Sequence, residues 1–170
     1  MLDSPSISVA TTQTFELTTR QKEVRAVFAT AAKYFLIYGG SRSGKTFLTI
    51  YTILTRMIKA PGSRHVVFRN DGIDAKQSIG NETIPAVIKL AYPTLALKWH
   101  DQDGYYEAPN GSQLWLAGLK DKARLDKVLG KEFCTIYLNE ASQITLEAFS
   151  VVQTRLAQVV TQTNGKRLPL

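Results

Sequence analysis

Cysteine is nearly absent from this sequence: Cys134 is the single one among 170 residues, so the chain cannot form an internal disulfide. A lone cysteine fits a reducing compartment. Long apolar runs are also missing, so no membrane-spanning helix is expected. The N-terminus lacks the basic and apolar regions of a secretory signal. Residues 1–14 are polar and rich in Ser and Thr, which predicts a flexible segment before one domain over residues 15–170.

Acidic residues are missing from a long stretch in the first half of the chain. Between Arg25 and Asp71 there are seven basic residues and no acid, whereas the remaining 14 basic residues balance the 14 acids. The formal charge of +7 therefore belongs to this stretch. Such a concentration favours contact with a polyanion such as nucleic acid, bound without regard to sequence and sensitive to salt. The alternative is a nucleotide pocket followed by a solvated helix face. The candidate nucleic-acid contacts are Arg56, Lys59, Arg64 and Arg69.

The most informative motif lies inside this acid-free stretch. Residues 34–38 (YFLIY) are strand-forming and lead into the pattern G-x-x-x-x-G-K-T, and residues 47–58 then read as a helix. Glycines let such a loop approach a phosphate closely, and the N–H groups of the loop and helix bind it. A buried strand, a phosphate loop and a helix are predicted, with a nucleoside triphosphate as ligand. A glycine-rich turn without ligand is the alternative. The loop residues are Gly39, Gly40, Ser41, Arg42, Ser43, Gly44, Lys45 and Thr46.

Several side chains near the loop have expected roles toward ATP and Mg²⁺. Lys45 brings its charge to the β- and γ-phosphates, and Thr46 offers its hydroxyl to Mg²⁺. Arg42 could reach charge developing on the γ-phosphate, contact a neighbouring subunit, or stay solvated. Upstream, residues 15–21 (FELTTRQ) resemble the Q motif of helicase-like ATPases. The Gln21 amide suits the adenine edge, which offers one donor and one acceptor; a surface glutamine in a capped helix is the alternative.

The second half of the expected site lacks the usual aspartate. Residues 133–138 predict an apolar strand, and Asn139 and Glu140 follow it. Glu140 is the expected general base that polarises the attacking water. Asn139 stands where the Walker B pattern has Asp, so it would accept from a metal-bound water without carrying charge, and weaker Mg²⁺ binding follows. A core strand ending in a polar loop is the alternative.

The remaining pattern alternates strands with helices. It predicts an α/β domain with a mainly parallel sheet flanked by helices, of the P-loop NTPase class with an additional strand (RecA/helicase-like). A β-hairpin insertion is expected near 105–117, around Asn110-Gly111. Further expected elements are a helix N-capped by Thr18 or Thr19 and running through Ala31, a strand at 64–69, a mostly helical stretch at 73–90 that Gly80 and Pro85 should break or kink, and a helix at 146–159.

With these residues in hand, the chain resembles the ATPase domain of the large terminase subunit of tailed bacteriophages over residues 15–158. The resemblance rests on the phosphate loop with its arginine, the strand at 66–69, the hairpin leading into 116–121, and the block 129–142 with Asn-Glu-Ala. It implies ATP hydrolysis that drives double-stranded DNA into a capsid. It also implies a homo-oligomeric ring on a capsid portal, a small terminase subunit as partner, no membrane contact, and the cytoplasm of an infected bacterial host.

The sequence departs from that family in two respects. Many relatives carry a candidate trans-acting arginine just before the glycine that matches Gly130, where this chain has Leu129; Arg124, Arg155 or no residue would serve instead. A full large terminase also continues into a further strand and a nuclease. This domain is therefore expected to be incomplete at its C-terminus, with an uncovered edge on the strand at 133–138, slow turnover and no nuclease activity. Two alternatives stay open: a nucleotide-gated DNA- or protein-binding module with little turnover, and a helicase-like remodelling ATPase.

Overall fold

The computed structural model describes residues 15–168, except for the side chains of residues 122–124. No helix in this described part is long and apolar enough to cross a bilayer. In chain order the elements are α1 (Thr19–Phe28), α2 (Lys45–Lys59), β1 (Arg64–Arg69), α3 (Gly72–Asp74), the π-helix η1 (Ala75–Thr83), α4 (Ile84–Ala91), β2 (Lys98–His100), β3 (Tyr105–Glu107), β4 (Gln113–Gly118), α5 (Lys122–Leu129), β5 (Thr135–Leu138), the 3-10 helix η2 (Ala141–Gln143), α6 (Leu146–Gln153), β6 (Val160–Thr161) and β7 (Arg167–Leu168).

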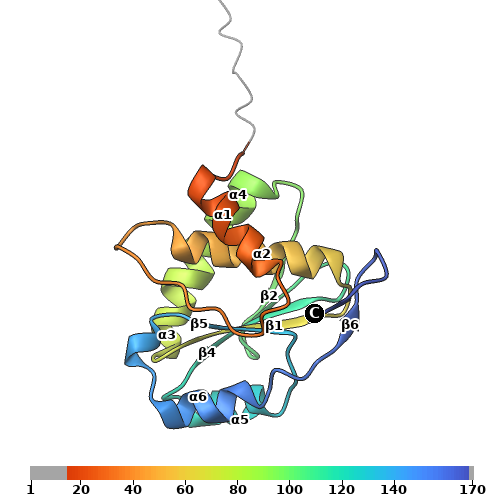
Figure 1. Ribbon diagram of the computed structural model, residues 1–170. Helices are drawn as coiled ribbons and strands as arrows, with labels where there is room; N and C mark the ends of the chain where they lie inside the picture. Colours follow the sequence, from red (N-terminus) through yellow and green to blue (C-terminus); the bar gives the residue numbers. More distant parts are fainter. Residues whose placement is uncertain (1–14, 169–170) are drawn as a thin grey trace, which may run out of the picture.

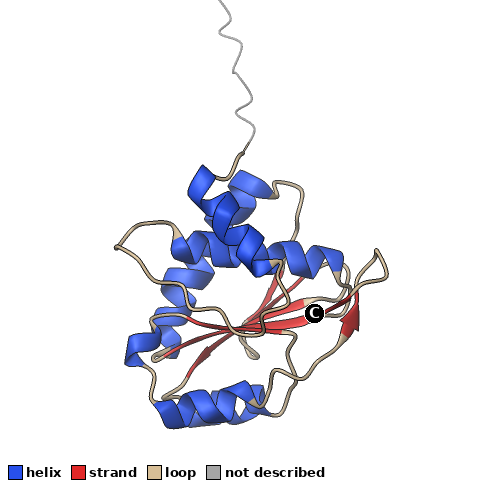
Figure 2. Cartoon of the chain, in the orientation of Figure 1, coloured by secondary structure: helices blue, strands red, loops and turns tan. Residues whose placement is uncertain are grey.

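The central sheet has five strands in the order β2-β3-β4-β1-β5 (Figures 1 and 2). β4, β1 and β5 run parallel, whereas β2, β3 and β4 form an antiparallel meander. We call the end where the parallel strands finish the carboxyl edge, and the end where they begin the amino edge. Parallel strands place the residues that follow them at one edge, so the carboxyl edge collects residues far apart in sequence.

Helices cover both faces of the sheet, with α2, η1 and α4 on one face and α5 and α6 on the other (Figure 2). Successive strand residues point to opposite faces. Val67 therefore packs among the residues of α2 and α4, whereas its neighbours Val66 and Phe68 pack toward α5 and α6. Each such side chain is fully buried and stabilises the fold by roughly 1.5–3 kcal/mol. β1 is thus the centre of the domain, buried on both faces.

Most of the predicted elements are confirmed. The strand at 64–69 and the hairpin around Asn110-Gly111 form as expected, with Gly111 at φ +78° in the turn. The stretch 73–90 stays helical because η1 takes π-helical geometry across Gly80, and Pro85 falls in the first turn of α4. Gly80 also lets η1 approach β4, since a Cβ there would lie 3.0 Å from Leu116 Cδ1. The helix at 146–159 is shorter than expected, and β2, α5, β6 and β7 were not expected.

The predicted buried strand at 34–38 is wrong. These residues belong to no strand, and Tyr34, Leu36 and Tyr38 are exposed by 58%, 83% and 86%. The segment crosses the molecule between α1 and the phosphate loop without entering the sheet (Figure 1). Strand propensity reflects packing on a pleated surface, and no described strand pairs with this segment. β5 is the outermost strand of the sheet among the described residues, so one of its long sides pairs with no described strand, as expected. The flexible segment predicted for residues 1–14 lies outside the described residues.

Candidate nucleotide site

The phosphate loop curves around the ammonium group of Lys45. Lys45 Nζ donates to the carbonyls of Gly39 (2.9 Å) and Gly40 (2.6 Å) and to the Ser43 hydroxyl (3.1 Å). Gly39 and Gly44 take φ values of +147° and +80°, which side chains rarely allow. Gly44 is also the N-cap of α2, and no side chain caps that end. The first N–H groups of a 15-residue helix therefore face the loop together with the lysine, as an anion site requires.

Thr46 and Arg42, the two loop residues expected to act on Mg²⁺ and the γ-phosphate, lie in different surroundings. Thr46 faces the end of β5, where Asn139 Nδ2 lies 3.5 Å from Thr46 Oγ1. Arg42 is exposed and stands in the left-handed region at φ +58°. A non-glycine residue there costs on the order of 1–3 kcal/mol, which the surrounding loop must offset. Ser41 completes the exposed tip of the loop.

The end of β5 lies directly beside the end of β1. Asn139 N donates to the carbonyl of Phe68 (2.9 Å), and Asn139 Nδ2 also donates to the Tyr137 hydroxyl (2.9 Å). Asn139 is buried, with 8% of its surface exposed. Its amide is therefore fixed in place beside the Thr46 hydroxyl, so the phosphate loop and the end of the second strand meet in one place.

The Glu140 carboxylate forms an ion pair with Arg69, the last residue of β1. Arg69 Nη2 donates to Glu140 Oε1, and Gln143 Nε2 donates to Glu140 Oε2 (3.1 Å). Glu140 itself has a left-handed backbone, at φ +56°. Arg69 Nε is buried and has no hydrogen-bond partner within the described residues. Both carboxylate oxygens of the expected base are thus engaged by protein donors.

The surroundings of Arg56 and Arg69 do not favour their candidate role as nucleic-acid contacts. Arg56 is held against the sheet, where Nη1 donates to Thr135 Oγ1 (2.7 Å), and burial lowers the pKa of its guanidinium. Arg69 is occupied by Glu140 and has only 16% of its side chain exposed. From the sequence alone Arg69 counts among the surface charges, yet its place at the end of a predicted strand is a usable signal that it lies at the carboxyl edge. Lys59 and Arg64 remain at the surface.

Helix α1 brings Gln21 to the phosphate loop. Thr18 and Gln21 form the predicted N-terminal cap as a reciprocal capping box, with Thr18 N donating to Gln21 Oε1 (3.0 Å). Gln21 Nε2 lies 3.1 Å from the point where a Cβ on Gly44 would stand. Any side chain at Gly44 would therefore crowd the Gln21 amide, which ties the start of α2 to α1.

A small hollow of about 260 Å³ opens between α1 and α2, lined by aromatic and basic side chains. Phe15 packs on Tyr51 with ring centroids 5.7 Å apart, and the Arg25 guanidinium lies 5.7 Å from the centroid of the Tyr51 ring. Aromatic rings and a guanidinium are surfaces on which a planar base stacks. Its lining residues are Phe15, Glu16, Leu17, Lys22, Arg25 and Tyr51.

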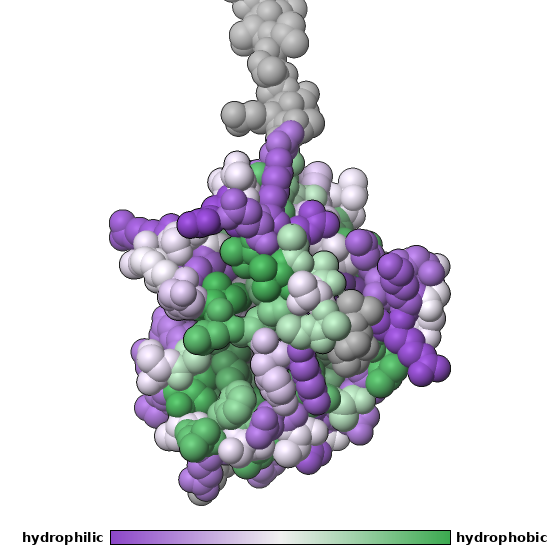
Figure 3. Space-filling view, viewed as in Figure 1, coloured by the Kyte–Doolittle hydropathy of each residue, from purple (hydrophilic) through white to green (hydrophobic). Residues whose placement is uncertain are grey.

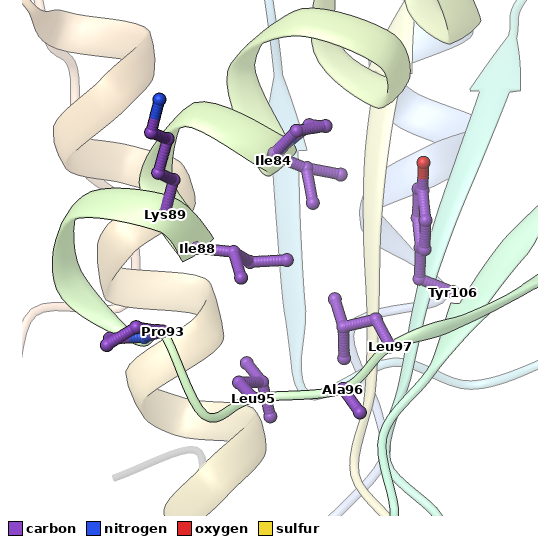
Figure 4. Close-up of a pocket in the computed structure, with 9 residues that line it drawn as sticks. Ile84, Ile88, Lys89, Pro93, Leu95, Ala96, Leu97 and Tyr106 are labelled. Carbon is purple, nitrogen blue, oxygen red and sulfur yellow. The ribbon is translucent and has the colours of Figure 1, made fainter.

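A larger hollow of about 550 Å³ lies elsewhere, between α4, the loop after it and β3. Ile84, Ile88 and Leu97 project toward this space in Figure 4, with Tyr106 at its far side. The lining is chiefly apolar and includes none of the phosphate-loop residues, so this groove is not part of the nucleotide site.

Arg155, one of the two candidate trans-acting arginines, is held at the amino edge of β5 and does not join the loop of its own chain. Arg155 Nη1 donates to the carbonyl of Leu129 (3.1 Å), and its own carbonyl accepts from Phe133 N (2.8 Å). The side chain of Arg124 lies outside the described part. A role of either arginine toward a neighbouring subunit stays a prediction.

A family model described as "Terminase large subunit, T4likevirus-type, N-terminal" matches residues 36–161 of the chain. The chain belongs to this family. The match covers the phosphate loop, β1 and the Asn-Glu end of β5, so the expected resemblance is confirmed. No protein with a curated description matches the sequence.

Solved terminase structures share the fold of this terminase chain. The large terminase of a thermophilic bacteriophage superposes with a TM-score of 0.72 at 14% identity, covering 85% of this chain and 37% of that one. The same phage protein in complex with ADP gives 0.68 at 14% identity, over 84% and 36%. The large terminase ATPase domain of Thermus phage P74-26 gives 0.52 at 16% identity, over 69% and 52%. The terminase chain thus spans just over a third of the thermophilic phage protein, and its P-loop NTPase fold, an α/β sheet flanked by helices, is confirmed.

Proposed function

We propose that this chain is the ATP-hydrolysing motor part of a large terminase, which drives double-stranded viral DNA into a capsid. The observation that carries the proposal is the meeting of the phosphate loop with the Asn-Glu end of β5, where Asn139 lies 3.5 Å from Thr46. The family membership and the ADP complex of the thermophilic phage terminase support it. ATP is the expected substrate.

Lys45 binds the phosphates of ATP in this proposal. Its three donor contacts now go to Gly39, Gly40 and Ser43, all atoms of the loop, and phosphate oxygens of stronger negative charge replace them. The N–H groups at the start of α2 bind the β-phosphate beside it. Gln21 and the hollow between α1 and α2 receive adenine, because Gln21 Nε2 lies next to Gly44 and the hollow offers a ring to stack on. Gln21 Oε1 accepts from Thr18 N and must leave this cap before it can accept from the base.

Mg²⁺ fits the pair of Thr46 and Asn139. Thr46 offers its hydroxyl oxygen, and Asn139 would accept from a metal-bound water through Oδ1, which requires its amide to turn because Nδ2 now faces Thr46. No group of three or more His, Cys, Asp or Glu gathers in the described residues to hold a metal alone. Such a site suits an ion that keeps most of its waters and is held through substrate phosphates. When bound, Mg²⁺ neutralises charge on the β- and γ-phosphates.

Glu140 polarises the attacking water, and Arg42 stabilises charge on the γ-phosphate. For Glu140 to act, its carboxylate must turn from Arg69 toward the loop, and the strained backbone at φ +56° lies at the pivot. The chain assembles as a homo-oligomeric ring on a capsid portal, with a small terminase subunit, in the cytoplasm of the infected host. Arg155 or Arg124 reaches a neighbour's γ-phosphate there.

A second candidate function is a nucleotide-gated DNA- or protein-binding module with little turnover. It is favoured by the engagement of both Glu140 carboxylate oxygens by Arg69 and Gln143. In that case ATP binds, but no carboxylate is available to polarise water.

ATP turnover with and without duplex DNA separates the two functions. For a motor, we expect turnover that DNA stimulates, and Glu140→Gln should retain ATP binding and lose turnover by about 10²–10⁴-fold. Gln143→Ala is the matched control: it removes a hydrogen-bond donor to the Glu140 carboxylate but leaves the carboxylate itself, so turnover should be kept. Nucleotide binding without turnover in the unmodified chain, whatever DNA is added, would favour the binding module instead.

A further inference from the structure

Two acid-free parts of the sequence meet at the amino edge of the domain. Residues 26–70 and 148–168 contain no Asp or Glu. The β6-β7 hairpin folds against the end of α2, where Thr163 N donates to the carbonyl of Lys59 (2.8 Å). The Gln158 side chain joins the same region, accepting from Arg64 N (2.6 Å) and donating to the carbonyl of Gly62 (3.1 Å). Figure 1 shows the hairpin beside the C-terminal end of α2, away from the phosphate loop.

This meeting gathers basic side chains on one surface, which we call the basic face: Lys59, Arg64, Lys166 and Arg167. Three of them are exposed and Arg64 is half-buried. None forms an ion pair with a described residue, whereas Lys22, Lys76 and Lys127 elsewhere are paired with carboxylates. Arg64 Nη1 donates to the main-chain carbonyl of Glu132 (3.3 Å), not to its carboxylate. In Figure 3, hydrophilic residues gather on the right of the molecule, where Figure 1 shows the hairpin.

We propose that the basic face binds the phosphate backbone of double-stranded DNA. The inference rests on the proposed packaging function and assigns where on the domain the DNA is held. Unpaired lysine and arginine side chains bind phosphates and release counterions, with no dependence on sequence.

The other side chains of the hairpin favour DNA over an acidic protein. Residues 161–164 are Thr, Gln, Thr and Asn, whose hydroxyl and amide groups are common phosphate contacts. Within residues 160–168 no large apolar side chain is exposed, and Leu168 is buried; beside the face, Ile58 and Val159 are exposed singly. A protein interface needs apolar or aromatic anchors at its centre, which this hairpin does not offer.

The basic face and the nucleotide site lie at opposite ends of α2. Lys45 and Thr46 begin this helix and Lys59 ends it, so the length of the helix, about 21 Å from Lys45 to Lys59 at 1.5 Å per residue, separates them. DNA on the basic face therefore leaves the phosphate loop open, and ATP and DNA can be held at once. A motor needs this arrangement, since DNA must stay bound while nucleotide is exchanged.

The test compares two triple variants that both lower the formal charge from +7 to +4. One removes three basic-face charges (Lys59→Ala, Lys166→Ala, Arg167→Ala), and the control removes three exposed lysines elsewhere (Lys89→Ala, Lys98→Ala, Lys120→Ala). Binding of a fluorescent mixed-sequence duplex is measured by anisotropy over a salt series. We expect the basic-face variant to bind about tenfold or more weakly, with a slope of log K against log salt shallower by about 2 to 3. The control should stay close to the unmodified chain.

Each outcome decides between the two proposals. An unmodified chain that does not bind duplex would overturn the packaging function and the basic face with it. An unmodified chain that binds, with equal losses in both variants or none in the basic-face variant, would overturn the basic face alone; the face would then suit an acidic protein surface. ADP affinity, measured on the same samples, should be unchanged in both variants, which shows that a loss of DNA binding does not come from misfolding.

Discussion

The two edges of the same parallel sheet are built in different ways. At the carboxyl edge Arg69 is the last residue of β1 and pairs with Glu140, which follows β5. Two non-glycine residues there, Arg42 and Glu140, hold left-handed backbones. At the amino edge the polar groups of Ser63, His65 and Ser112 are fully buried and joined by hydrogen bonds. Strain and unpaired polar atoms collect where chemistry is expected, and satisfied networks collect where the sheet is held together.

The network at the amino edge has a clear structural task. Ser112 Oγ lies 3.0 Å from the Met57 carbonyl and 2.9 Å from the Ala60 carbonyl, so it binds the last turn of α2. His65 bonds Ser63 (2.9 Å), and Cys134 Sγ donates to the Arg64 carbonyl (3.2 Å). Burial raises the pKa of the Cys134 thiol to about 11, so this cysteine stays protonated and packs as a small core residue. Substitutions at the carboxyl edge should therefore change nucleotide binding, whereas substitutions at the amino edge should change stability.

The largest expected effect is at the carboxyl edge. Lys45→Ala removes the cation that the phosphate loop surrounds, so we expect ATP affinity to fall by about 100-fold or more, at a cost of roughly 3 kcal/mol in binding. Its three contacts are to its own exposed loop, so the urea midpoint of unfolding should hardly move. Titration with a fluorescent ATP analogue and a urea melt check both. A large drop in the midpoint would show that the two edges are not separable.

An intermediate effect is expected at the amino edge. Ser112→Ala removes a buried hydroxyl that bonds the Met57 and Ala60 carbonyls at the end of α2. Each carbonyl keeps a second donor, Asn110 Nδ2 and Ser63 N, so we expect a loss of about 0.5–1.5 kcal/mol of unfolding free energy. ATP affinity should be unchanged, since the lost bonds lie at the far end of α2 from the loop. Ser150→Ala, which removes a hydroxyl bonded within α6 at the surface, is the control and should cost little. Equal losses in the two variants would contradict the structural role of the network.

The most gradual expected effect is a dependence of stability on pH. Burial lowers the pKa of His65 to about 3, whereas an unfolded histidine titrates near 6.5. The unfolded chain therefore takes up the proton first. The stability from a neutral His65 is complete above pH 6.5 and is lost as the pH falls toward 3, by at most about 1.4 kcal/mol per pH unit.

Urea melts between about pH 7.5 and pH 5 check this in matched histidine variants. His65→Gln should remove this component of the acid loss. His100→Gln, at a half-buried site on β2, should retain it. If the stability of His65→Gln falls with pH as steeply as that of the unmodified chain, another group controls the acid sensitivity.

Elements that depend on neighbouring residues could be predicted from the sequence. Thr18 and Gln21 cap α1 because they stand three residues apart, and α2 ends before Pro61-Gly62, which stops a helix. The hairpin around Asn110-Gly111 follows from the turn that this pair favours. The strand predicted at 34–38 does not form, because a strand needs a second strand to pair with and the local sequence cannot show whether one is present. β6 and β7, with two residues each, are too short to show a pattern.

The sequence alone determined the phosphate loop, because the glycines, the lysine and the threonine that shape it are close together in the chain and their backbone preferences are local. It also placed Asn139 and Glu140 at the end of an apolar strand. Only the tertiary structure decided that Arg69 is paired with Glu140, 71 residues away, and that the β6-β7 hairpin joins Lys59 at the amino edge. Both depend on which strands and segments pack side by side, and that choice is settled by burial across the whole domain, not by residues near one another in the chain.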